Sequence, residues 1–304
     1  MATETQAELG RIGVFSVPLE VVPRRTAAAF VGELEELGYG AVWTGEGLGT
    51  REIFVNASVV LADTQRIVFG AGIANIYARD AVTTVTATRT LEESYPGRFL
   101  LGLGVSHREQ VDPRGHTYGK PVATMRAYLE AMDSAPFVSP MPEETAATKP
   151  VRRVLAAFRP RMLALSAELA DGAHPYMTVP EATARAREIL GPGKLLVPEQ
   201  AFLLERDPAV ARRAGRAYLA WYLGVENFRA SLLWQGFGED DLAGGGSDRL
   251  VDAIVAWGDE EAVRRRVQEH LDAGADHVCV QAIAEDPLEL SLDAYRRVAP
   301  ALLR

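Results

Sequence analysis

The sequence predicts an α/β protein, a single domain over residues 1–304 built as a (β/α)8 TIM barrel with insertion segments. Strand-like and helix-like segments alternate along the whole chain, and eight of them have the character of strands. Such alternation favours parallel strands, and eight units of this kind close into a barrel. The length of 304 residues, 48% of them hydrophobic, suits one barrel. The alternative is an open doubly wound sheet, but the Gly-x-Gly-x-x-Gly turn expected after its first strand is missing at Ser16-Val-Pro18.

The predicted strands are short apolar runs, as expected for strands buried on both faces. They cover residues 11–17, 41–44, 66–73, 99–105, 151–157, 172–174, 194–204 and 277–283. The predicted helices cover residues 26–37, 53–62, 81–95, 122–132, 160–170, 181–190, 207–223, 227–237, 260–271 and 290–303. In the first of these helices Phe30, Leu34 and Leu37 recur at helical spacing, and Gly38 provides the stop.

Three connecting segments are expected to be irregular. Residues 106–121 form a polar loop that is long enough to be functional. Residues 136–150 contain four prolines and no periodicity, which indicates a surface insertion. The glycine-rich tract at residues 243–247 is expected to be a flexible loop.

The most informative local feature is the segment 95–107, which reads as a turn, an apolar strand and a polar exit. Gly102 and Gly104 allow backbone or a planar ligand to approach closely, and the strand delivers Ser106 and His107. A histidine just past a buried parallel strand lies where α/β barrels carry their chemistry. The alternative is a plain strand that ends in a polar loop.

Composition and charge narrow the function classes. A formal net charge of −9 argues against nucleic acid as the main partner, because phosphate binding needs a basic surface. The single cysteine, Cys279, lies in an apolar run and is expected to be a buried, inert thiol. The isolated histidines predict no metal site. No apolar run is long enough to predict a membrane span, and the polar start Met1–Leu9 lacks signal-peptide character, so a cytoplasmic location is expected.

Candidate site residues follow the strands, since the carboxyl ends of barrel strands converge on one face. In strand order these residues are Trp43, Thr44 and Glu46; Gly72, Ile73, Ala74 and Asn75; Ser106 and His107; Phe158, Arg159 and Arg161; His174 and Tyr176; Glu199 and Gln200; and Gln281. Arg159-Pro160-Arg161 opens a helix, so the helix dipole and two guanidinium groups favour a phosphate there, with a solvated helix start as the alternative. Glu46 either takes part in chemistry or pairs with a nearby arginine such as Arg51.

Five segments together resemble the luciferase-like flavin and deazaflavin oxidoreductases, and look closest to the actinobacterial branch that uses coenzyme F420, an 8-hydroxy-5-deazaflavin. These segments are residues 33–43, 70–79, 95–107, 159–163 with 170–172, and 274–277. They span nearly the whole chain in the family's order. The resemblance implies a cis peptide at Gly72–Ile73 behind the deazaflavin ring, and the cofactor phosphate at residues 158–162. It also implies a homodimer formed through helices near the second and third strands.

The resemblance also assigns roles to the candidate residues. His107 matches a position that handles a proton near the hydride carbon, and it suits that role near neutral pH. A catalytic histidine of several relatives is absent after Trp43, where Glu46 is the nearest ionisable substitute. The expected cofactor contacts are Trp43, Gly72, Ile73, Ala74, Asn75, Gly104, Ser106, Phe158, Arg159, Arg161 and Met162. The expected substrate contacts are His174, Tyr176 and Gln200.

Three functions follow as alternatives. The first is an oxidoreductase that moves a hydride between coenzyme F420 and a small organic substrate, and the small-residue segment 70–75 favours it. The second is an FMN-dependent monooxygenase on the same fold. The third is a barrel that binds a ligand without chemistry, and its support is the missing histidine after the second strand.

Overall fold

The computed structural model describes residues 9–138 and 151–303. Its strands form one sheet in the order β10-β9-β11-β1-β2-β3-β5-β6-β7-β8, and every pair in this order is parallel. β8 (Leu195–Leu196) and β9 (Glu199–Leu203) are two parts of one extended segment, since only two residues separate them. Because β8 pairs with β7 and β9 pairs with β11, the sheet returns on itself, and the predicted barrel is confirmed.

The predicted strands all form, most of them shorter than expected. The remaining strands are β1 (Ile12–Phe15), β2 (Ala41–Thr44), β3 (Val68–Ala71), β4 (Ala74–Asn75), β5 (Phe99–Gly104), β6 (Arg153–Leu155), β7 (Gly172–Ala173), β10 (Val255–Trp257) and β11 (Val278–Ala282). The third predicted strand, residues 66–73, forms β3, and the unpredicted β4 follows it after the Gly72–Ile73 peptide bond, which is cis. β10 was not predicted. It pairs with β9, which lies between β10 and β11 in the sheet.

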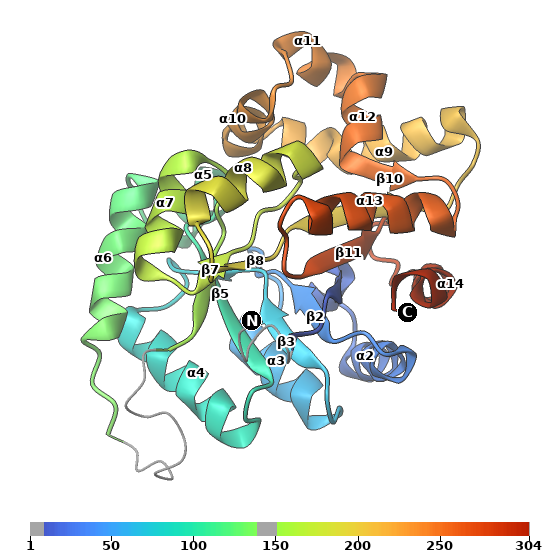
Figure 1. Cartoon of the computed structure of the whole chain (residues 1–304). Helices are drawn as coiled ribbons and strands as arrows, with labels where there is room; N and C mark the ends of the chain where they lie inside the picture. The colour runs from blue at the N-terminus through green and yellow to red at the C-terminus, as the bar shows by residue number, and fades with distance from the viewer. Residues whose placement is uncertain (1–8, 139–150, 304) are drawn as a thin grey trace.

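Helices surround the barrel, as Figure 1 shows. They are α2 (Arg24–Leu37), α3 (Ile53–Ala62), α4 (Ala81–Ser94), α5 (Arg108–Val111), α6 (Pro121–Asp133), α7 (Pro160–Leu169), α8 (Pro180–Leu190), α9 (Pro208–Leu223), α10 (Glu226–Gln235), α11 (Glu239–Leu242), α12 (Asp248–Ile254), α13 (Glu260–Asp272) and α14 (Leu292–Leu302). Figure 1 shows α9 to α12 together at one side of the molecule, where they form the insertion between β9 and β10.

Two of the segments expected to be irregular contain short helices. The predicted loop at residues 106–121 includes α5 and a 3-10 turn at Asp112–Arg114. The glycine tract forms a 3-10 turn at Ala243–Gly245, and α11 and α12 flank it without having been predicted. Most of the predicted insertion at residues 136–150 lies outside the described residues.

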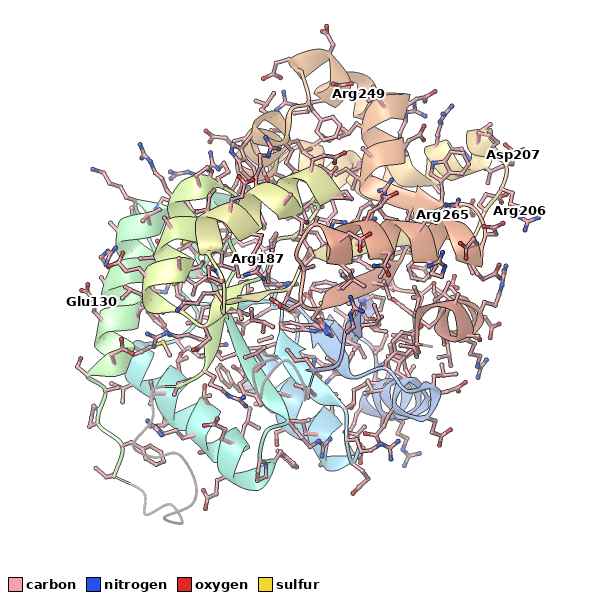
Figure 2. All side chains as sticks on the ribbon, viewed as in Figure 1. Glu130, Arg187, Arg206, Asp207, Arg249 and Arg265 are labelled. Carbon is pink, nitrogen blue, oxygen red and sulfur yellow. The ribbon has the colours of Figure 1, made fainter. Side chains whose placement is uncertain are left out.

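The core has an inner and an outer part. Inside the barrel, Trp43 packs with Leu100, Val154 and Cys279, so the thiol is buried as expected. Outside it, the helices bury an apolar layer against the strands. Charged side chains lie at the periphery, and Figure 2 shows Glu130 there among the labelled residues. In the described part of the chain no helix has the length and apolar character of a membrane span.

Candidate functional site

A cavity of about 1030 Å³ opens where the barrel strands end. The exits of β1, β2, β3, β5, β6, β7 and β11 contribute to its wall, and α9 and α10 cover it. Thirteen of the predicted site residues line it: Glu46, Gly72, Ile73, Gly104, Ser106, His107, Phe158, Arg159, Arg161, Met162, His174, Tyr176 and Gln281. The strand ends therefore converge on one space, as the barrel topology requires.

Six predicted site residues are not in the cavity wall: Trp43, Thr44, Ala74, Asn75, Glu199 and Gln200. Trp43 is buried inside the barrel, where its ring stacks on His174 at 4.9 Å and its Nε1 donates to His277 Nε2 at 3.3 Å. Gln200 points to the surrounding helices: its Nε2 donates to the Ile254 carbonyl at 2.8 Å. Ala74 and Asn75 are buried in β4 and outside the cavity wall.

The two glycines of the fourth predicted strand, β5, are required by the packing of the protein itself. A Cβ at Gly102 would lie 1.9 Å from the Ala71 carbonyl oxygen, and one at Gly104 would lie 2.6 Å from Ile73 Cδ1. The close approach predicted at Gly102 is therefore made by backbone, not by a planar ligand.

His107 is the last residue of the short segment after β5 and is the N-cap residue of α5. Its ring lies 4.9 Å from that of Phe228 and 6.2 Å from that of Trp221, in an aromatic corner of the cavity. Its Nδ1 is buried and has no hydrogen-bond partner among the described residues. Burial lowers the pKa of His107, while Glu109 opposes the shift. Near neutral pH the imidazole is therefore unprotonated and able to accept a proton.

Glu46 is ion-paired, but with Arg79 rather than with Arg51. Its Oε2 accepts from Arg79 Nη1 at 3.0 Å and from the Asn75 backbone N–H at 2.9 Å. Arg51 instead donates to the Val22 carbonyl at 2.6 Å. The Glu46 side chain is only 4% exposed, so this carboxylate ties the β2 exit to the segment after β3.

Glu20 is a functional candidate that the sequence analysis missed. It ends the 3-10 turn Val17–Glu20 after β1, lines the cavity and accepts from the Gly47 backbone N–H at 3.1 Å. Burial, with a contribution from nearby Glu46, raises the pKa of Glu20 to about 7 against the hydrogen bonds from Gly47 and Thr50. The first strand was predicted to end at Val17. Glu20 is an acidic residue three positions after this strand end, and that position is the signal that would have identified it.

Arg159 and Arg161 line the cavity at the start of α7. Both are exposed, and Arg159 donates to Asn227 Oδ1 at 3.0 Å. No side chain caps this helix N-terminus. The helix dipole and two guanidinium groups thus favour an anion at this end of the cavity.

Tyrosine hydroxyls form a network in the wall between the β7 exit and α9. Tyr176 donates to Gln281 Oε1 at 2.8 Å, accepts from Tyr218 at 3.1 Å and lies 2.8 Å from the Tyr222 hydroxyl. Beside it, His174 donates from Nδ1 to the Val197 carbonyl at 2.6 Å. Burial lowers the pKa of His174 to about 4, so its Nε2 is an unprotonated acceptor.

In the described part of the chain, no three histidine, cysteine or acidic side chains are grouped so as to hold a metal ion. The buried polar atoms and the cationic helix start instead suit an organic ligand that carries a phosphate. A flat ring next to His107 and a phosphate at α7 would both fit within this one cavity.

Comparison with known proteins gives a consistent result. Residues 8–277 match the family model described as luciferase-like monooxygenase. A 5,10-methylenetetrahydromethanopterin reductase of Methanolobus tindarius is 24% identical, with 84% of this chain and 88% of that protein covered. An F420-dependent secondary alcohol dehydrogenase, solved with an F420-acetone adduct, superposes with a TM-score of 0.71 at 15% identity, over 96% of this chain and 98% of that one. An FMN-bound type II Baeyer-Villiger monooxygenase from Pseudomonas putida superposes with a TM-score of 0.70 at 15% identity, over the same shares.

Proposed function

The chain belongs to the luciferase-like monooxygenase family, and from this membership we propose that it is an oxidoreductase that moves a hydride between coenzyme F420 and a small organic substrate. The observation that carries the proposal is a single cavity that combines an anion-binding helix start, Arg159-Pro160-Arg161, with two proton-handling groups, Glu20 and His107. The F420-dependent dehydrogenase of similar fold supports the choice of cofactor.

The cavity wall offers a place for each part of the cofactor. Arg159, Arg161 and the free N–H groups at the start of α7 would hold its phosphate. Gly72, Ile73 and Ser106 would lie against its ring, while Trp43, Ala74 and Asn75 would support that wall from behind. The bound deazaflavin would supply the carbon that takes up or releases the hydride.

The protein's own contribution is to hold and move the proton that accompanies the hydride. His107 is unprotonated near neutral pH and is positioned to accept this proton. Glu20, whose pKa burial raises to about 7, can hold or release one in the same range. Glu46 was predicted as catalytic, but because Arg79 pairs with it we assign it a positioning role.

The cofactor is tested by titrating the purified protein with oxidised F420 and following the quenching of tryptophan fluorescence. Replacing Arg159 and Arg161 by alanine should weaken binding by about 100-fold, since two charge-assisted contacts to the phosphate are lost. Arg126→Ala is the matched control, because this exposed arginine pairs with Glu168 and lies outside the cavity. His107→Ala should reduce turnover and leave F420 binding unchanged.

An FMN-dependent monooxygenase is the second candidate, and the FMN-bound enzyme of similar fold favours it. Tight FMN binding with NADH-dependent oxygen uptake, and no quenching by F420, would replace the first proposal by this one. Binding of F420 without turnover of any substrate, unchanged in the His107→Ala variant, would instead favour a barrel that has lost its chemistry.

We further propose a homodimer formed through α3. This helix is apolar on all sides, and Val55 is 63% exposed on its outer face. A helix that is hydrophobic all round is normally covered by another surface, and exposed Val82 on neighbouring α4 extends the patch. Val55→Lys should therefore shift the protein to a monomer in sedimentation experiments, whereas Val21→Lys, at another exposed valine, should not.

A further inference from the structure

The charged groups of the cavity are divided between two opposite sides of the barrel. In the ring of strands, β6 stands across from β1. The only cations in the described cavity wall, Arg159 and Arg161, follow β6. Glu20 follows β1, and Glu285, Asp286 and Glu289 line the mouth after β11, which pairs with β1. One side of the cavity is therefore cationic and the other is acidic.

Aromatic rings extend from the acidic side, where Tyr176 donates to Gln281 of β11, to the cationic side, where the ring of Phe228 lies 5.1 Å from that of Phe158 after β6. Tyr222 on α9 lies with its ring centroid 4.9 Å from Phe228, 5.1 Å from Trp221 and 5.7 Å from Tyr176. Tyr218 adds a further ring at 5.2 Å from Tyr222. All five rings line the cavity, so the aromatic wall borders both its acidic and its cationic side.

The hydroxyls in this wall present oxygen acceptors. The Tyr176 hydroxyl has one hydrogen, which it donates to Gln281, and it accepts from Tyr218. The Tyr222 hydroxyl can then only donate to the Tyr176 oxygen. Tyr218 and Tyr222 therefore both use their hydrogen on Tyr176, and their oxygen lone pairs are directed to partners other than Tyr176. The wall therefore combines carboxylates, phenol oxygens and π-faces, all of which attract positive charge.

We propose that the acidic and aromatic half of the cavity binds the ammonium group of an organic amine, which is the class of substrate that the enzyme accepts. The inference rests on the proposed function in one respect: the cofactor occupies the arginine half. The ring of Tyr176 lies 5.2 Å from that of Phe15, which ends β1, the strand that Glu20 follows. Carboxylate and phosphate substrates would be repelled from this half.

Three small probes that share a phenyl ring and differ in charge test the proposal: benzylamine, benzyl alcohol and benzoate. Their binding to the cofactor-free protein is measured by calorimetry at about pH 8, where the amine is cationic. Benzylamine should bind about tenfold more tightly than benzyl alcohol, because cation–π and carboxylate contacts act only on the ammonium. Equal affinities for the amine and the alcohol, or tighter binding of the alcohol, would overturn the proposal.

Variants assign the binding to one side of the cavity. Glu20→Gln and Tyr176→Leu should each bring the affinity for benzylamine close to that for benzyl alcohol, while Arg161→Ala should leave the preference for the amine intact. A preference that survives both Glu20→Gln and Asp286→Asn would place the ammonium elsewhere and refute the site. If the protein prefers benzylamine to benzyl alcohol but F420 does not quench its tryptophan fluorescence, only the proposed cofactor is contradicted. If F420 quenches the fluorescence but benzylamine is not preferred, only the proposed substrate class is contradicted.

Discussion

Glu20 and His107 face one cavity with opposite pKa shifts. Burial raises the pKa of the carboxyl to about 7, and it lowers the pKa of the imidazole, because in each case the charged form is desolvated. Near neutral pH the two groups are thus a carboxyl that is partly protonated and an imidazole that is not. Pairs of groups whose environments set different protonation states are typical of acid–base sites.

The role of Glu20 can be tested by pH dependence. In the direction of substrate oxidation the carboxylate is the base, so kcat/KM should rise with pH through about 7 and then level off. Glu20→Gln should remove this limb and lower kcat by about 100-fold. His116→Gln is the control, since this exposed histidine lies outside the cavity. If the rise of kcat/KM near pH 7 persists in the Glu20→Gln variant, it belongs to another titrating group.

Glu199 provides a stability test away from the cavity wall. Its Oε2 accepts from the Met177 backbone N–H at 3.1 Å, Oε1 has no partner among the described residues, and burial raises its pKa from 4.5 to about 8. The folded protein keeps a proton that the unfolded chain loses, so stability is full below pH 4.5 and is lost as the pH rises toward 8. Glu199→Gln should therefore raise the free energy of unfolding by about 2–4 kcal/mol at about pH 9.

The measurement for Glu199 is urea denaturation at several pH values. Near pH 4.5 the variant and the wild type should be equally stable, because both side chains are then neutral. Glu188→Gln, at an exposed position on α8, should change little at any pH. A variant that is less stable than the wild type at high pH would show that a partner of the carboxylate has been overlooked.

The sequence did not reveal which side of its strand each polar site residue faces. Gln200 and Gln281 lie on the paired strands β9 and β11, and the register aligns Gln200 with Val280. Gln200 faces the helices, where it accepts from His270, while Gln281 faces the cavity and accepts from Tyr176. Both strands are buried on both faces, so the alternation that normally separates inside from outside is missing.

Among the elements, those with a strong local signal were predicted well. α3 forms over the predicted residues 53–62, and β2 over the predicted residues 41–44. α11, α12 and β10 were missed because each is too short for periodicity to emerge, and tertiary packing of the insertion decides their structure. The pairing of β10 with β9 is similarly a property of the assembled sheet.

The fourth predicted strand, β5, allows a prediction about the packing of neighbouring strands. Gly102→Ala should destabilise the protein by about 2–4 kcal/mol, because the new Cβ would lie 1.9 Å from the Ala71 carbonyl oxygen and the strands would have to separate. Gly32→Ala is the matched control: this glycine lies within α2 and a Cβ there meets nothing within 4 Å. The control should stabilise by about 0.5–1 kcal/mol, since alanine favours the helix. Thermal unfolding of both variants measures the difference, and equal effects would contradict the packing argument.

At the scale of the whole molecule, barrel closure brings residues far apart in sequence to one cavity. Glu20 and Arg161 are separated by more than half the sequence stretch that the family model covers, and only the ring of strands places them across one space. Local sequence predicted the anion site at Arg161, because a helix start and two arginines suffice. It did not predict the acidic and aromatic half, because α9, α10 and the segment after β11 meet only in the folded barrel.

Three buried histidines should make the whole barrel sensitive to acid. His174 and His277 lie inside it and His270 lies under its helices; burial lowers their pKa values to about 4, about 4 and about 3. The unfolded chain takes up protons below about pH 6.5, and the folded protein does not, so stability is lost as the pH falls from 6.5 toward 4. Each group contributes up to about 1.4 kcal/mol per pH unit, and Glu20 and Glu199 oppose this slope, because their raised pKa values let the folded protein keep protons that the unfolded chain releases.

The acid sensitivity is measured by urea denaturation between about pH 7 and pH 5, above the range in which most carboxylates titrate. His270→Gln should lower the slope of stability against pH by up to about 1.4 kcal/mol per pH unit, whatever its effect at pH 7, because one titrating group is removed. His116→Gln, at an exposed position, should leave the slope unchanged. A slope that is the same in His270→Gln as in the wild type would mean that the folded protein admits protons to this ring, contrary to its burial.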